Sequence, residues 1–237
     1  MLFRSATGSF FLKKGFSLGR AYEAKPVGGA VLPVVLAALL VIGVATGAYA
    51  VSTEGPGSKH APIILSLVVA LIIGALAQKS RMCFAGSIRD IILMKNFDLI
   101  SIIAALFAVM AVYNAATGSF HLGFSGQPIA HSQHLWNILG MYVVGFAAVL
   151  AGGCPLRQLI LAGQGSSDSA VTFLGMLIGA AFAHNFGLVG AAAKAATETE
   201  PAVAGGPAAA GKIAVIVCII VLFVIAGTKL RRKKTAK

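Results

Sequence analysis

Two cysteines, each at a break between apolar segments, are the residues of this sequence best suited to chemistry. Cys83 lies in the polar stretch 78–90, and Cys154 lies in the Gly-rich stretch 152–157. Where a helix begins after such a break, its first amide groups lack partners and attract anions. A thiol adds a weak, polarizable hydrogen bond. This combination suits a small anion that carries sulfur or selenium.

Each break also has an arginine close behind its cysteine. Arg89 follows Cys83 by six residues, and Arg157 follows Cys154 by three. An arginine at membrane depth is a functional hypothesis by default, because burying its charge is costly. For Arg89 two other interpretations stay open, a pair with the neighbouring Asp90 and an anchor at the membrane interface. We predict that both arginines supply charge to a substrate pathway.

Further polar side chains have simpler alternatives. His184 and Asn185, inside the apolar segment 170–189, are candidates for the pathway or for hydrogen bonds between helices. Cys218 has only apolar neighbours and is interpreted as a small buried hydrophobic residue. The histidines show no metal-ligand spacing, and no hydrolase triad, P-loop or dinucleotide motif is present. The sequence therefore predicts no catalytic residues, no metal and no cofactor.

The two breaks belong to an internal repeat. Gly74 precedes Cys83 by nine residues, as Gly145 precedes Cys154, so the two copies are offset by 154 − 83 = 71 residues. Each copy has an apolar helix, a break with a cysteine, a short amphipathic piece, a polar turn and a second apolar helix. The copies cover 62–116 and 136–190. Interrupted segments at corresponding positions of a repeat are the best sequence indication of a transporter's binding site.

Composition places these repeats in a membrane. The chain is 58% hydrophobic and 11% charged, with a mean hydropathy of +0.89. Soluble domains carry about 25% charged residues. The net charge of +12 is concentrated beside apolar segments, as expected for topology signals, and not in a nucleic-acid-binding pattern. We predict an all-α polytopic protein of the lipid bilayer that binds no nucleic acid.

Apolar segments long enough to cross or enter the bilayer set the expected organisation. Six spans are expected, at 28–51, 63–77, 99–116, 138–150, 170–189 and 213–227, with short helices at 88–97 and 155–162. Residues 1–27 form a basic arm, either interfacial or connecting, and 191–211 form an Ala/Gly/Pro-rich loop. Residues 212–237 form the last helix and a basic tail. Six spans place both basic ends on the cytoplasmic side.

Three motifs in this sequence support a family resemblance. Arg81-Met-Cys-Phe-Ala-Gly-Ser-Ile-Arg-Asp90, Gly152-Gly-Cys-Pro-Leu-Arg-Gln-Leu-Ile160 and Phe182-Ala-His-Asn-Phe-Gly187 resemble the YeeE/YedE family of membrane proteins. The resemblance implies an hourglass-shaped, all-helical transporter of the bacterial inner membrane. Its substrate would be thiosulfate or a selenium compound, passed along by thiol hydrogen bonds. The motifs carry this role over to Cys154 first and then to Cys83.

Full-length members of that family contain two related halves, and this chain resembles the second. Residues 8–20 are similar to the segment that joins the halves, and 28–51 would be the linking helix. The resemblance thus implies a homodimer or a separate N-terminal half as partner. Two further hypotheses are a thiol sulfur carrier that forms a persulfide on Cys154, and a structural subunit without a pathway of its own.

Overall fold

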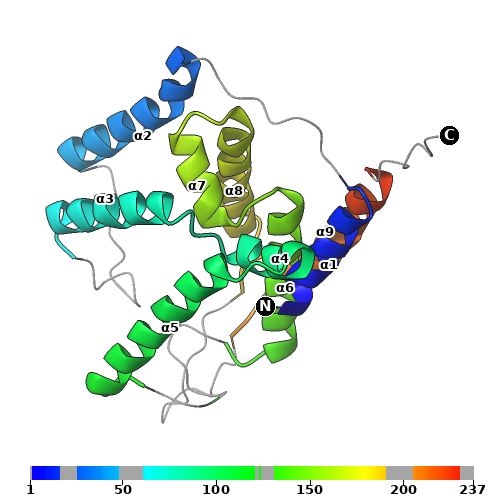
Figure 1. Cartoon of the computed structure of the whole chain (residues 1–237). Coiled ribbons are helices and arrows are strands. Elements are labelled where there is room, and N and C mark those ends of the chain that lie inside the picture. Colours follow the sequence, from blue (N-terminus) through cyan, green and yellow to red (C-terminus); the bar gives the residue numbers. More distant parts are fainter. Residues whose placement is uncertain are drawn as a thin grey trace, which may run out of the picture. The chain divides into compact units, whose positions relative to one another are not determined.

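The computed structural model describes residues 2–16, 26–47, 61–120, 123, 131–190 and 205–229. Within these ranges the chain forms helices and no β-strand (Figure 1). The helices are α1 (Leu2–Lys13), α2 (Pro26–Thr46), α3 (Ile63–Lys79), α4 (Phe84–Met94), α5 (Asp98–Ala116), α6 (His134–Leu150), α7 (Pro155–Gly163), α8 (Ser167–Asn185) and α9 (Ala209–Thr228). The expected all-α class is confirmed.

Several of these helices are long and apolar enough to cross a membrane. The described residues contain four such spans, at Val27–Thr46, Ile63–Met94, Asp98–Ala116 and Ala209–Thr228, and a fifth if α6 and α7 form one span. The chain is therefore a multi-pass membrane protein. The expected number of six is not confirmed among the described residues, since α8 is less apolar than these spans. Its ends carry Asp168, His184 and Asn185, which lower its hydropathy.

Parts of the expected organisation lie outside the described residues. These are the end of the basic arm at 17–25, the end of the first span at 48–51, most of the connection between α5 and α6, residues 191–204 of the Ala/Gly/Pro-rich loop, and the tail from residue 230 onward.

The 71-residue repeat is visible in the helix boundaries. Helices α3 and α6 begin at 63 and 134 and end at 79 and 150, and α4 and α7 begin at 84 and 155. Each of these three differences is 71. The register shifts after this point: α4 and α7 end at 94 and 163, and α5 and α8 begin at 98 and 167, so these positions differ by 69. The breaks around the two cysteines are therefore equivalent in detail, with the same length in both copies.

The short helix of the first repeat differs from its expected range of 88–97. It begins at Phe84, because Cys83 has an extended backbone and caps the helix with its side chain. It ends at Met94, because Lys95 adopts the left-handed conformation with φ 55° and closes the last turn. The second short helix begins at Pro155, as expected from the preference of proline for the first helical position.

The described helices divide between two compact units. The first unit holds residues 1–19, 83–154 and 176–237. In it, α1 contacts α6 and α4, and α9 contacts α6. Its aromatic centre is Phe146, which is fully buried. The centroid of its ring lies 5.9 Å from that of Phe11 and 5.1 Å from that of Phe223. The N-terminal segment is thus a helix packed on protein over its described part.

Close backbone approach holds α1 on α6. A Cβ atom added to Gly8 would lie 2.6 Å from the Cβ of Val149, so only glycine fits there. This is the type of small-residue contact that allows helices to pack in membranes.

The second unit holds residues 20–82 and 155–175. Here α7 contacts both α2 and α3. Gly29 in α2 lies against Gly165, where a Cβ on Gly29 would be 2.9 Å from the Gly165 Cα. Gly165 also has a φ of +94°, a conformation that other residues rarely adopt. Two glycines in contact therefore fix α2 to the end of α7.

The units do not follow the boundaries of the repeats. The first unit pairs α4 of the first repeat with α6 of the second, and the second unit pairs α3 of the first repeat with α7 of the second. These two pairs are equivalent, because α3 corresponds to α6 and α4 to α7. The repeats therefore exchange helices and are not independent domains.

Candidate functional site

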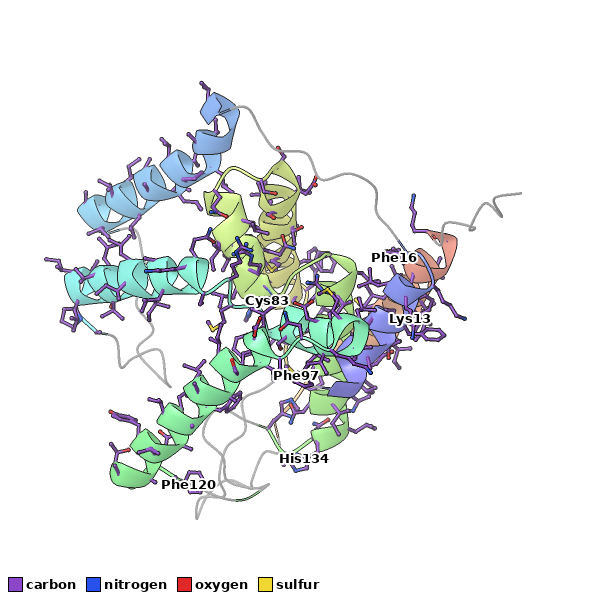
Figure 2. All side chains as sticks on the ribbon, in the orientation of Figure 1. Lys13, Phe16, Cys83, Phe97, Phe120 and His134 are labelled. Carbon is purple, nitrogen blue, oxygen red and sulfur yellow. The ribbon has the colours of Figure 1, made fainter. Side chains whose placement is uncertain are left out.

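Cys83 starts α4 and is the first element of the candidate site (Figure 2). Its Sγ accepts a hydrogen bond from the backbone N–H of Gly86 at 3.2 Å, in place of the usual Ser or Asp oxygen. A Cβ on Gly86 would lie 3.1 Å from this sulfur. The absence of a side chain at position 86 therefore lets the amide reach the thiol. Cys83 is only 6% exposed.

Cys154 meets Cys83 within the first unit. Its backbone N–H donates to the Cys83 Sγ at 3.3 Å, which places the two cysteines in contact. Cys154 is 4% exposed. The preceding Gly152 has a φ of +81°, which lets the chain turn out of α6 before the cysteine. The structure thus brings together two equivalent residues that are 71 positions apart.

We call Cys83 and Cys154 the cysteine pair. The Cys83 sulfur accepts two N–H groups, so its own proton remains available as a donor. Hydrogen bonds in such a chain polarise one another, which makes the S–H a better donor than in isolation. The residues of α4 that follow Cys83 are buried as well, among them Ala85, Ser87 and Ile88.

Arg89 forms an ion pair with its neighbour. Its Nη2 lies 2.8 Å and its Nε 2.9 Å from Oδ1 of Asp90. Asp90 is buried, whereas Arg89 is half-buried. The guanidinium therefore compensates the charge of the Asp90 carboxylate, which is the first of the two alternative interpretations of Arg89. This arrangement leaves less of the Arg89 charge for a passing anion.

Arg157 has a different partner. Within the second unit, its Nη1 donates to Oε1 of Gln78 at 2.9 Å, across the contact between α7 and α3. Over the described parts of the chain, Arg157 makes no ion pair with a carboxylate. Its charge is oriented but not cancelled. Gln78 was not among the residues singled out from sequence, although it opens the polar stretch that contains Cys83.

The other candidates lie apart from these interactions. His184 and Asn185 are exposed at the end of α8, and Asn185 donates to the carbonyl of Ala181 one turn earlier at 2.8 Å. Among the described residues, no hydrogen bond joins either of them to the cysteine pair. Cys218 is exposed on α9, not buried as its apolar neighbours suggested. In the described part of the chain, no three His, Cys, Asp or Glu side chains are grouped to hold a metal ion.

Comparison with known proteins gives this arrangement a family context. The model of the sulphur transport family matches residues 79–237, which is more than half of the chain and includes both cysteines. The chain belongs to the sulphur transport family. The resemblance to YeeE/YedE proteins seen in the sequence motifs is thereby confirmed.

Individual members of the family match over a shorter length. The thiosulfate transporter TsuA of Spirochaeta thermophila is 30% identical over 115 residues, which cover 46% of this chain and 33% of the relative. The TsuA of Escherichia coli is 26% identical over 121 residues, which cover 49% of this chain and 32% of that relative. The matched region thus spans about a third of each of these relatives. No solved structure matches the chain.

Proposed function

We propose that this sulphur transport protein is a transporter, or one half of a transporter, for a small anion that contains sulfur or selenium. Thiosulfate is the first candidate and a selenium compound the second. The observation that carries the proposal is the contact between Cys83 and Cys154, one from each equivalent break. The names of the two TsuA relatives support the choice of thiosulfate.

The cysteine pair suits the sulfur end of such an anion. The terminal sulfur of thiosulfate is a large, soft acceptor, and a thiol proton is a matching weak donor. With two thiols side by side, the anion can exchange one S–H···S contact for the other without losing its partner. Both thiols are buried, so a substrate reaches them only when the packing around α4 opens. No covalent bond to sulfur is needed, and we infer that the protein is not an enzyme.

An anion on the pathway also needs positive charge at some point along its way. Arg157 supplies it best, because its partner is neutral, whereas Arg89 is compensated by Asp90. The helix N-termini at the two breaks add partial positive charge. In this proposal His184 and Asn185 remain candidates for a more distant part of the pathway.

Further parts of the proposal concern the protein's setting. We propose the bacterial inner membrane, with both basic termini in the cytoplasm. Because the chain matches only about a third of each relative, a second copy or a separate N-terminal half would complete the pathway.

The experiment is uptake of ³⁵S-thiosulfate by cells that depend on this gene. We expect Cys154→Ala and Cys83→Ala to abolish uptake, and the matched Cys218→Ala variant to retain it. Excess selenite and sulfate serve as competitors that define the substrate class. Normal uptake by the Cys83→Ala, Cys154→Ala double variant would contradict the proposal and favour a structural subunit. A persulfide on Cys154, detected by mass spectrometry during turnover, would favour a sulfur carrier instead.

A further inference from the structure

We propose that Gln78 is a specificity-determining residue, which orients the Arg157 guanidinium without cancelling its charge and forms an anion-binding site with it. The inference rests on the proposed function and deepens it. It names a group of the second unit that recognises the charge of the substrate.

The geometry of this pair leaves one orientation of the glutamine amide. A guanidinium carries only donors, so the Gln78 oxygen must face Arg157 and the amide NH₂ must point elsewhere. The 2.9 Å contact between Nη1 and Oε1 agrees with this orientation. It engages one of the five guanidinium N–H groups. The pair therefore presents only donors to a ligand, as a site for an oxyanion requires.

The neutrality of the partner is the second argument. Burial of an unpaired cation near apolar spans is costly, and a carboxylate at position 78 would offset that cost. The same chain uses this solution for Arg89, whose guanidinium lies 2.8 Å from the Asp90 carboxylate. Arg157 and Gln78 are both half-buried, and a contact between an amide and a guanidinium keeps a net charge of one. Retaining that charge is useful if an anion binds there.

The internal repeat provides the third argument. With the 71-residue offset, Gln78 corresponds to Val149, since 78 + 71 = 149, and Arg157 corresponds to Gly86, since 157 − 71 = 86. Val149 packs against Gly8, and Gly86 serves the Cys83 thiol. The positions equivalent to Gln78 and Arg157 are therefore occupied by two apolar residues that have other contacts. Equivalent helix packing does not require Gln78 or Arg157, so a functional reason is needed for this pair.

The test compares Gln78→Glu with the wild type. The new carboxylate forms an ion pair with Arg157 and repels the anion, so we expect KM for thiosulfate uptake to rise about tenfold or more, with a smaller change in kcat. Gln78→Ala keeps the charge but loses its orientation, and should cause a smaller increase. The matched control is Gln164→Glu, an exposed position in the same unit that adds the same negative charge without contacting Arg157. It should leave KM unchanged.

Three results would overturn the inference: an unchanged KM in Gln78→Glu, an equal effect of Gln164→Glu, or a loss confined to kcat in every Gln78 variant. Oxidative cross-linking of the cysteine pair verifies that each variant is folded. Equilibrium binding of ³⁵S-thiosulfate to the purified protein separates this inference from the proposed function. If the wild type binds the anion and Gln78→Glu does not, while neither transports it, the anion site stands and the transport function fails. If Cys154→Ala abolishes uptake but the Gln78→Glu variant binds thiosulfate normally, the transport function stands and the anion site fails.

Discussion

Oxidation should join Cys83 to Cys154 by a disulfide and stop transport. The two cysteines are in contact through the hydrogen bond from the Cys154 backbone N–H to the Cys83 Sγ at 3.3 Å, and neither is in a disulfide. Diamide would take two protons and two electrons from the pair and become a hydrazine, while one S–S bond forms. The bond would consume both thiol protons, which are the donors proposed to hold the sulfur of the anion. We expect uptake to fall with the extent of cross-linking and to recover fully on addition of dithiothreitol.

The size of the effect on stability follows from the length of the closed loop. A bond between residues 71 positions apart restricts the unfolded chain and should stabilise the oxidised protein by roughly 4 kcal/mol if no strain is introduced. Thermal unfolding in detergent, compared between oxidised and reduced protein, measures this change. The stabilisation should disappear in Cys83→Ala and Cys154→Ala and persist in Cys218→Ala.

The assay for the bond itself is mass spectrometry of digested, non-reduced protein. A peptide that links the Cys83 and Cys154 segments, lighter by two hydrogens than the sum of its parts, is the expected product. If diamide leaves this pair unlinked while the exposed Cys218 is fully modified, the two thiols are not in contact and the reasoning on the candidate site fails. Uptake that continues at full rate through cross-linked protein would refute the pathway role of the pair.

Other variants test single contacts. Gly86→Ala places a Cβ 3.1 Å from the sulfur of Cys83, so uptake should fall although alanine favours a helix; an unchanged rate would show that the amide contact is dispensable. Asp90→Asn leaves Arg89 without its counter-charge and should cost about 1–2 kcal/mol of stability, because the pair is partly exposed; thermal unfolding measures this loss, and thiosulfate uptake should persist. Phe146→Ala removes a fully buried ring and should cost about 3–5 kcal/mol, with a lower melting temperature in detergent; a stability equal to the wild type would contradict the described core.

Apolar segments and their interruptions allowed most helices to be predicted. Long runs without charge and the proline at position 155 mark where the helices lie. The repeat is marked by the equal distance of each cysteine from the glycine that precedes it by nine residues. These features depend on local sequence, which is why sequence alone reveals them.

An unusual helix cap and the long-range contacts could not be predicted from the sequence. The start of α4 was expected four residues too late, because a thiol is not among the usual capping groups. The hydrogen bond between Gln78 and Arg157 depends on the packing of α3 against α7, which are not neighbours in the chain. The packing of α1 on α6 depends on Gly8, which as a single residue gives no signal of a close approach.

The exchange of helices between the repeats also constrains the order of assembly during synthesis. Helices α2 and α3 emerge from the ribosome well before α7, the helix that both of them contact in their unit. They must therefore enter the membrane before the helix that both of them contact has been made. A gene divided in the loop between α5 and α6 would leave each fragment with one member of the α3–α7 pair and one of the α4–α6 pair. Two such fragments could regain the native contacts only by recognising each other.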